Sequence, residues 1–439
     1  MTRLVLDELL DPSEVRVVVD RAADGSVARA RLALSDLPRV EPVLLGRPVA
    51  RIPALVERLC GLCPAAHHLA GVRALEALGG AAPLPAQATA VRRLLHHASA
   101  VQAHAARAAT LGRDPADVAA LARFAADALA AAGMPSHFPA TAVPGGVRVT
   151  VPAPVREALL AAVPDAVAAA RRIALGALAD APDPAAAPLA FTGADVALVD
   201  ADGRPDLLGT HLRAVAADGT VLHHAQPAAR LTAVLAEQHP GAAAPRPYLR
   251  MLGPDAGRYR VGPVAQLGVG PLRTPQAADL QDSWARGPRA AAPARAIMAV
   301  AAVEAVAEVL SDGAVCAPPE PVAVTLTGLP AGASGVGWVD GPRGLLVHRY
   351  VTGDDDVLHA ATILTPTAQN EPWLADLLHA AAQGDGTQGD GTKDSTQDGT
   401  VGPLERAVRE ADPCLPCTAA PLGAMRLTLT GAPDTPEGR

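Results

Sequence analysis

The spacing of apolar residues along the chain predicts a helix-rich protein. From Pro53 to Leu78, and again from Ala88 to Leu111, apolar residues recur every three or four positions, as on the buried face of a helix. The same spacing, broken by Pro and Gly, predicts further helices at 118–132, 155–181, 291–310, 371–383 and 404–410. Helices therefore dominate the first half of the chain.

Strands are predicted at fewer places. Residues 14–34 alternate apolar and polar side chains around an Asp-Gly turn, which is typical of a hairpin. Residues 321–327 and 344–350 also have the pattern of strands, whereas 182–250 is assigned loops and short strands. The expected fold class is mainly α (α+β), with a small N-terminal β-sheet and short peripheral strands.

One segment has no side chains that could pack. Residues 384–400, GDGTQGDGTKDSTQDGT, carry no apolar side chain and repeat the sequence GDGT. Because such a segment has nothing to bury, it is predicted to be a flexible, low-complexity surface insert.

Composition and charge exclude several classes of partner. The chain has 439 residues and a formal net charge of -8, with no long Lys/Arg tract, which argues against nucleic acid or an anionic membrane surface as a partner. The N-terminal sequence MTRLVLDELLDPSE is acidic and lacks the apolar stretch of a signal peptide. Apolar runs such as 297–303 fall far short of the roughly 18 residues of a membrane span. We expect a cytoplasmic protein with reduced thiols.

Four of the five cysteines form two Cys-x-x-Cys pairs. Cys60 and Cys63 make the first pair, Cys414 and Cys417 make the second, and Cys316 stands alone. This spacing lets two thiolates converge on one soft metal. A chain of this length does not need disulfides to fold, so the thiols are free for chemistry.

Four explanations of the two pairs compete. Redox Cys-x-x-Cys motifs normally occur once per domain beside a thioredoxin-like unit, which is absent from the predicted elements. A structural zinc site usually has its halves some 15 to 20 residues apart, whereas these pairs are about 350 residues apart. The third explanation is a catalytic, thiolate-bound transition metal where the two ends of the chain meet. The fourth, four buried apolar cysteines, fits matched pairs poorly.

The longer strings around these pairs resemble a known family. ERLCGLCPAAHHLA matches the motif Arg-x-Cys-Gly-x-Cys-x-x-x-His of the large (alpha) subunit of nickel-iron hydrogenases, and DPCLPC matches that family's second metal motif. Other matches follow in family order at 41–48, 137–147, 259–269, 341–350, 369–370 and 420–429. The chain resembles most closely the cytoplasmic bidirectional, NAD-linked type. This implies one large-subunit domain, 1–439, with a central bundle of long helices.

The resemblance also implies a set of metal ligands. Cys60, Cys63, Cys414 and Cys417 would hold nickel, and Cys63 and Cys417 would also bridge to an iron that carries CO and CN ligands. Such soft ligands suit a redox-active metal pair. The terminal thiolates, Cys60 and Cys414, are plausible proton acceptors when dihydrogen splits.

Four further residues acquire roles in the same way. His67 would hydrogen-bond the bridging sulfur, and Arg343 would hold its guanidinium over the open metal position and orient Asp412. Glu41 matches a carboxylate that holds a magnesium ion. Taken without the motifs, His67 would be an ordinary surface histidine, Arg343 a turn residue and Glu41 a solvated glutamate.

The chain departs from the family at several positions. Pro12 replaces the glutamate that relays protons from nickel, and Glu14, two residues on, would be a displaced substitute. Ala103 replaces a Ser or Asp near the metal, although the neighbouring His104 matches. Ala420 replaces the histidine that binds magnesium and marks the site where a protease trims the tail. Residues 421–439 resemble that cleavable tail.

The leading interpretation is therefore a hydrogenase large subunit that interconverts dihydrogen with protons and electrons. The chain has no further cysteine sets for iron-sulfur clusters, so electrons would leave through a separate iron-sulfur small subunit. NAD(P)-reactive diaphorase subunits and maturation proteins are further partners by analogy. Two alternatives stay open: a degenerate subunit with a structural or assembly role and no hydrogenase activity, and a zinc-only structural site.

Overall fold

The computed structural model describes residues 14–34, 40–181, 191–242, 244–287, 289–384, 391–393 and 402–431. Pro12 lies outside these residues, as does most of the segment predicted to be a flexible insert. Within the described ranges, no helix is both long and apolar enough to cross a membrane.

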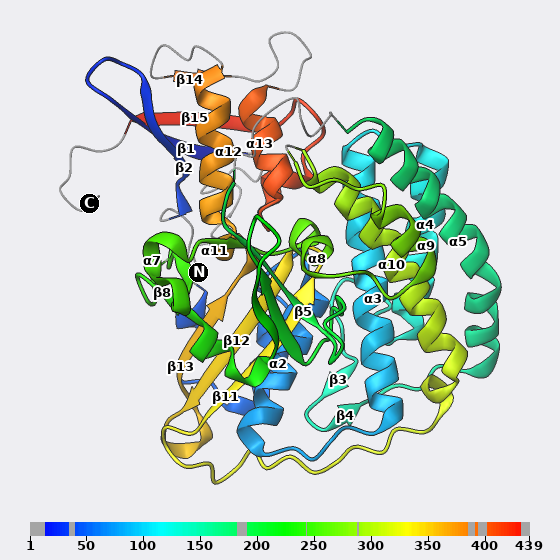
Figure 1. Cartoon of the computed structure of the whole chain (residues 1–439). Helices are drawn as coiled ribbons and strands as arrows, with labels where there is room; N and C mark the ends of the chain where they lie inside the picture. Colours follow the sequence, from blue (N-terminus) through cyan, green and yellow to red (C-terminus); the bar gives the residue numbers. More distant parts are fainter. Residues whose placement is uncertain are drawn as a thin grey trace, which may run out of the picture.

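Long helices pack side by side in one half of the molecule (Figure 1). They are α3 (Ala86–Thr110), α4 (Pro115–Ala131), α5 (Ala153–Ala179) and α10 (Ala291–Asp312). Helix α4 begins sharply because the Asp114 carboxylate accepts hydrogen bonds from the amides of Ala116 and Asp117. Helix α10 is apolar on nearly every side and packs against both α3 and α5, so it forms the centre of the bundle.

The other half of the molecule contains two larger sheets and two small hairpins. One sheet has the order β10-β5-β6-β7 and the other β11-β12-β13. Their strands are β5 (Ala194–Val199), β6 (His211–Val215), β7 (Val221–Pro227), β10 (Tyr259–Arg260), β11 (Ser334–Gly341), β12 (Gly344–Thr352) and β13 (Leu358–Leu364). The hairpins join β3 (Ala142–Val143) to β4 (Gly146–Val147) and β8 (Leu235–Glu237) to β9 (Pro247–Leu249).

Shorter helices connect these elements. They are α1 (Ile52–Val56), α6 (Leu231–Val234), α7 (Gly253–Ala256), α8 (Pro263–Val269), α9 (Pro275–Gln281), α11 (Pro366–Gln369), α12 (Glu371–Gly384) and α13 (Pro403–Ala411). Helices α12 and α13 pack on each other near the top of Figure 1.

The two ends of the described chain share one sheet. Its order is β14-β15-β1-β2, with β1 (Glu14–Arg21), β2 (Val27–Leu32), β14 (Gly391–Lys393) and β15 (Arg426–Gly431). Strand β15 runs parallel to β1 over six residue pairs. Val17, Met425 and Leu427 are buried in the main core. The sheet thus ties the segment after the second cysteine motif to the start of the chain.

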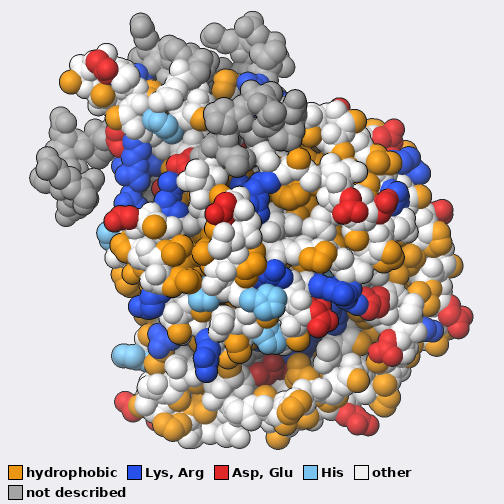
Figure 2. All heavy atoms as spheres, viewed as in Figure 1, with side chains coloured by type: hydrophobic (Ala, Val, Ile, Leu, Met, Phe, Trp, Pro, Cys, Tyr) orange, Lys and Arg blue, Asp and Glu red, His pale blue; other side chains and the backbone are white. Residues whose placement is uncertain are grey.

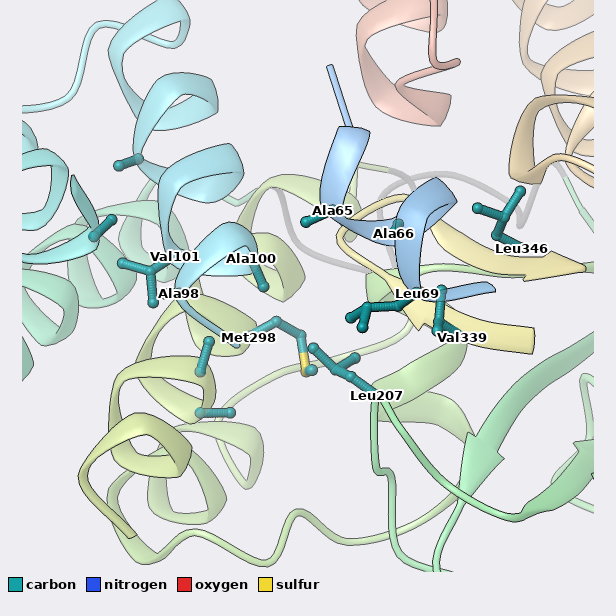
Figure 3. Close-up of a cluster of buried hydrophobic side chains, with 14 of the residues drawn as sticks. Ala65, Ala66, Leu69, Ala98, Ala100, Val101, Leu207, Met298, Val339 and Leu346 are labelled. Atoms are coloured by element: carbon teal, nitrogen blue, oxygen red, sulfur yellow. The ribbon is translucent and has the colours of Figure 1, made fainter. Parts of the chain in front are cut away.

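Helix α2 (Pro64–Gly79) lies directly on β11 and β12. A Cβ atom at Gly335 or Gly337 would come within 2.1 Å of the carbonyl oxygens of Ala74 and Ala70, respectively. The absence of side chains at these two strand positions therefore lets the helix backbone rest on the sheet. Leu69 of α2 faces Val339 of β11 in the core shared with the helix bundle (Figure 3).

The main expectations about the fold are confirmed: a helix-rich α+β protein with a long-helix bundle, an N-terminal hairpin and peripheral strands. The helix predicted from Pro53 to Leu78 is wrong as a continuous element, because the chain turns at 57–63. The strand predicted at 321–327 is also wrong. That segment is extended, but it makes only isolated backbone hydrogen bonds, from Val322 to Gly145 and from Thr325 to Gly79.

Candidate metal centre

The first cysteine pair lies in the turn between α1 and α2. Cys63 is the residue before the helix, with φ -146° and ψ 49°, and Pro64 occupies the first helical position. Proline is favoured there because its missing N–H would have no partner in the first turn. The pair is therefore not inside a helix, as the apolar spacing had predicted, but in a tight loop at the start of one.

The second pair follows directly on the end of α13. Asp412 terminates the helix in the left-handed conformation, at φ 47°, and Pro413 prevents its continuation. The backbone amide of Cys414 then donates a 2.7 Å hydrogen bond to the Thr367 hydroxyl. A short 3₁₀ helix, Pro416–Ala419, carries Cys417.

Three thiols from the two motifs meet. The Sγ atoms of Cys60 and Cys414 lie 3.0 Å apart, and that of Cys63 lies 3.3 Å from Cys60 and 3.4 Å from Cys414. Among the described residues, these three form the one group of His, Cys and acidic side chains close enough to share a metal ion. Cys417 is buried, with 1% of its surface exposed, and lies outside this group.

The thiols strongly perturb one another's ionisation. Hydrogen bonds from Cys414, Cys63 and His67 lower the pKa of Cys60 far below its ordinary value. Hydrogen bonding to Cys60 raises the pKa of Cys414 to about 12, and burial raises that of Cys417 to about 12. The cluster thus favours a single thiolate, and a bound cation would allow the remaining thiols to ionise as well.

A buried carboxylate beside the cluster is surrounded by arginines. One Asp412 oxygen lies 3.5 Å from Arg343 Nε and 3.6 Å from Arg295 Nε, and the other lies 3.9 Å from Arg107 Nη2. Burial alone would raise the pKa of Asp412, but the three guanidinium groups outweigh it and hold the pKa well below its usual range. Asp412 is therefore ionised at neutral pH.

Arg343 has hydrogen-bonding capacity to spare. Its Nε and Nη1 atoms are buried and make no hydrogen bond within the described part of the chain. Burial opposes its charge, but Asp412 and the nearby thiols raise its pKa above the usual value. Arg343 is thus a charged side chain with unused donors, close enough to the thiols to interact with them electrostatically.

Two histidines lie close to these groups. The imidazole of His67 is within reach of the Cys60 thiol, and its Nδ1 lies 3.1 Å from Nε2 of His348. His104 lies near Arg295, Arg343 and Asp412, and burial followed by the arginine charges lowers its pKa to about 3. Ala103, the preceding residue, adds no polar group.

Comparisons with known proteins show which family this chain resembles. The sequence model described as nickel-dependent hydrogenase matches residues 39–131, which include the first cysteine pair. The F420-non-reducing hydrogenase vhu of Methanococcus voltae contains a polypeptide that is 28% identical, over 84% of this chain and 95% of that protein. The crystal structure of an NAD+-reducing [NiFe]-hydrogenase in the H2-reduced state superposes with a TM-score of 0.76 at 27% identity, covering 92% of this chain and 96% of that one.

The chain is similar to the large-subunit family of nickel-dependent hydrogenases. A further relative is the NAD-reducing hydrogenase HoxS subunit beta of Cupriavidus necator, 25% identical over 94% of both chains. A [NiFeSe]-hydrogenase structure shares the fold, with a TM-score of 0.63 at 17% identity. The resemblance predicted from the two cysteine motifs is confirmed.

The positions where this chain departs from the family that it resembles have specific surroundings. The Ala420 carbonyl accepts a 2.8 Å hydrogen bond from Arg409, which also pairs with the buried Glu405. Glu41 begins a 3₁₀ helix at Glu41–Val43, and its charge adds to the burial that raises the pKa of Glu237. Glu14 is the first residue of β1, and its backbone pairs with Arg426.

Sequence reasoning missed four residues of this candidate site. Arg107 and Arg295 lie on helices predicted correctly, but an arginine on a helix gives no sign that it turns inward. Thr367 likewise gives no local sign of its contact with the second cysteine motif. His348 could have been found, because it lies within the motif GPRGLLVHRY already matched to the family.

Proposed function

We propose that this chain is the large catalytic subunit of a nickel-iron hydrogenase that catalyses reversible oxidation of dihydrogen to protons and electrons. The observation that carries the proposal is the meeting of three thiols from opposite ends of the chain, within 3.4 Å of one another, beside a buried arginine with unused donors. Structural cysteines would not require such an arginine.

The residues present fit a thiolate-bound metal pair. Three soft sulfur donors converge. The arginines around Asp412 keep this carboxylate ionised beside them. Cys60, Cys63, Cys414 and Cys417 would hold nickel, and Cys63 and Cys417 would also hold an iron that carries CO and CN. When bound, this centre supplies the Lewis acidity and redox chemistry for heterolytic cleavage of dihydrogen.

Cys417 has to join the other three thiols for this ligand set to be complete. It lies in the short 3₁₀ helix Pro416–Ala419, which begins two residues after Cys414, and Arg107 donates a 2.9 Å hydrogen bond to the carbonyl of the next residue, Thr418. The proposed ligand set includes Cys417 because it shares the second motif with Cys414 and is buried.

Arg343 and Asp412 are proposed to position and polarise dihydrogen. The Arg343 guanidinium, held by Asp412, directs N–H groups toward the space beside the thiols, where a fixed positive charge favours charge separation in the substrate. Asp412 supplies no donor of its own. Its role is to hold the arginine, and the two further guanidinium groups around it keep it ionised.

Protons are proposed to leave by way of sulfur. The Cys414 thiolate would accept the proton at Sγ, with Cys60 as the second terminal ligand and His67 as the hydrogen-bond donor beside it. The family's relay glutamate is replaced by Pro12, so the onward path differs. Glu14 stays a candidate for that path. Normal turnover in a Glu14→Gln variant would exclude Glu14 from the proton path.

Partners and location follow by analogy. The HoxS protein and the NAD+-reducing hydrogenase are named for a reaction with NAD, so we propose an iron-sulfur small subunit, NAD(P)-reactive diaphorase subunits and maturation proteins as partners. The surface in Figure 2 intersperses Arg with Asp and Glu side chains, which gives no single-sign field for nucleic acid. We propose a cytoplasmic complex. Glu41 is the proposed magnesium ligand, and Ala420 cannot supply the second ligand that the family's histidine provides at its position.

Metal analysis tests the proposal directly. The chain would be purified after coexpression with maturation proteins, and its nickel and iron contents measured. About one nickel and one iron per chain, with infrared bands from CO and CN, are expected from the proposed ligand set. Zinc alone, or no metal, would refute the enzyme assignment. A Cys63→Ser variant should lose both metals, whereas Cys316→Ser, outside both motifs, should retain them.

A second function has specific support. The replacements at Pro12, Ala103 and Ala420, and the position of Cys417 outside the cluster, favour a degenerate subunit that keeps the fold and serves in assembly. Hydrogen-dependent reduction of an artificial electron acceptor by the complete complex separates the two functions. Metal-loaded protein without this activity would favour the assembly role.

A further inference from the structure

Three buried side chains, His67, His348 and Tyr350, form a hydrogen-bonded series from the thiol cluster into the sheet. His67 Nδ1 lies 3.1 Å from His348 Nε2, and His348 Nδ1 lies 2.6 Å from the Tyr350 hydroxyl. His348 and Tyr350 are fully buried on β12, and His67 is 5% exposed on α2. The contacts therefore join the helix that follows the first cysteine pair to the strand that follows Arg343.

A glycine allows this approach. A Cβ atom at Gly71, one helical turn after His67, would lie 2.8 Å from Val56 Cγ2 and 3.2 Å from the Tyr350 hydroxyl. The bare helix surface at this point gives the phenol room to reach His348. The three polar side chains are thus tightly packed. The direction of each hydrogen bond between them depends on which atom of each pair carries a proton.

The direction of the bonds follows from the charge states of the two inner groups. Burial raises the pKa of Tyr350 and lowers that of His348, so the phenol keeps its proton and the imidazole is neutral. Among the described residues, the Tyr350 hydroxyl makes a hydrogen bond only to His348. Donation from Tyr350 to Nδ1 avoids a buried, unsatisfied O–H group.

The remaining hydrogen bonds then all run in one direction, from Tyr350 through His348 to His67. Because Nδ1 of His348 accepts from Tyr350, the one proton of this neutral ring is on Nε2, which donates to Nδ1 of His67. A His67 ring that accepts at Nδ1 carries its own proton at Nε2. Since Nδ1 faces His348, Nε2 is the nitrogen available to the Cys60 thiol.

We propose that His348 and Tyr350 are positioning residues that fix His67 in the tautomer with its N–H at Nε2, directed at the metal-binding sulfur of Cys60. A hydrogen bond donated to a ligand sulfur withdraws electron density from it and so tunes the metal it binds. The effect on a metal rests on the proposed function. The tautomer itself is a property of the protein without metal.

Nitrogen-15 NMR of histidine-labelled, metal-free, full-length protein tests the proposal. Signals are assigned with His67→Gln and His348→Gln. Both rings should show protonated Nε2 and unprotonated Nδ1 in the wild type. In Tyr350→Phe both rings should lose this single form and populate the other tautomer. Tyr259→Phe is the matched control, because Tyr259 is equally buried but bonds Gln369, and it should leave both rings unchanged.

Several outcomes would overturn the proposal. A proton on Nδ1 of either ring in the wild type contradicts the polarity, and unchanged tautomers in Tyr350→Phe contradict the role of the phenol. If Tyr350→Phe does not fold, His348→Gln, which retains a donor, should preserve the His67 tautomer, and His348→Leu should not. These readouts need no metal, so they stand even if nickel and iron are absent. In metal-loaded protein, Tyr350→Phe should also shift the infrared bands, and Tyr259→Phe should not.

Discussion

Arg343 Nε and Asp412 Oδ2 lie 3.5 Å apart, although the two residues are separated by most of the C-terminal quarter of the chain. Arg343 belongs to the tight turn between β11 and β12, and Asp412 ends α13 in a left-handed conformation. The pair therefore fixes the second cysteine motif against the turn that carries the guanidinium. A change in Arg343 tests the contribution of the guanidinium to turnover, and a change in Asp412 tests the contribution of the carboxylate to stability.

Replacing Arg343 by lysine should lower turnover with little effect on metal content. Lysine keeps a positive charge but lacks the planar fork that can bond Asp412 and still direct an N–H group elsewhere. By analogy with the removal of one preorganised donor, we expect kcat to fall about 10²–10³-fold. Hydrogen-dependent dye reduction and metal analysis measure the two effects.

The matched control for this variant is Arg171→Lys. Arg171 pairs with Asp279 at 3.3 Å on the surface of the bundle, where the Asp279 side chain is 70% exposed. Arg171→Lys should have wild-type turnover. Wild-type turnover in Arg343→Lys as well would exclude a role for its guanidinium geometry.

Replacing Asp412 by asparagine should destabilise the protein strongly. The change leaves Arg107, Arg295 and Arg343 buried without their shared counter-charge, and breaking a buried ion pair typically costs about 3–5 kcal/mol. The pKa of Asp412 is depressed in the folded state, so its contribution is present above its usual pKa and is lost as the pH falls below about 4. Denaturant unfolding at pH 7 and at pH 3.5 measures this dependence.

The stability difference between wild type and Asp412→Asn should therefore be largest near neutral pH and shrink in acid. Asp279→Asn, at the exposed surface pair, should change the unfolding free energy by less than about 0.5 kcal/mol. An equal difference at both pH values for Asp412→Asn would show that its charge does not contribute as described.

Asp340 should give the opposite pH dependence. It is fully buried, and burial raises its pKa to about 7 although Leu198 N and Gln266 Nε2 donate to its carboxylate. Between about pH 4 and pH 7 the folded state then binds more protons than the unfolded state, so stability falls as pH rises through this window. The loss is at most about 4 kcal/mol, from roughly three pH units at 1.36 kcal/mol each.

Asp340→Asn should remove this slope while keeping the fold. Gln266 can turn its amide to accept from the new side chain, since its Oε1 has no hydrogen-bond partner within the described residues. Unfolding free energies of both proteins at pH 4.5, 6 and 7.5 should diverge, with the variant gaining relative to the wild type as pH rises. Parallel curves would mean that Asp340 does not titrate in this range.

How far the sequence predicts this molecule depends on whether a feature is local. The cysteine pairs and the N-terminal hairpin were predicted because a few neighbouring residues determine them. The turn that interrupts the helix around Cys60 was missed, because apolar residues continue on both sides of it at helical spacing. The inward direction of Arg107 and Arg295 could not be read from the sequence, since their partner Asp412 lies more than a hundred residues away.

The segment after Ala420 should be needed for stability, whether or not a protease can reach it. Strand β15 lies between β14 and β1, and Met425, Leu427 and Leu429 are 0%, 4% and 8% exposed. Burial of each such side chain contributes about 1.5–3 kcal/mol, so ending the chain after Pro421 should cost several kcal/mol. Thermal and denaturant unfolding of the truncated chain, compared with one ending after Gly431, measures this cost.

Whether residues 421–439 are cleaved from the natural protein is tested by a separate measurement, the intact mass. Arg409 donates to the carbonyls of Ala420 and Pro421 at 2.8 and 2.7 Å, and the Gly423 amide donates to Glu405 at 3.0 Å, so the backbone around the family's cleavage position is tied down. We expect the intact mass of protein coexpressed with its maturation proteins to include residues 421–439. Ala420→His restores the family's processing residue. It should yield a shortened chain if the protease fails to cleave the wild type because it requires this histidine. An intact mass that ends at Ala420 in the wild type would show instead that cleavage proceeds without the histidine and that β15 is displaced.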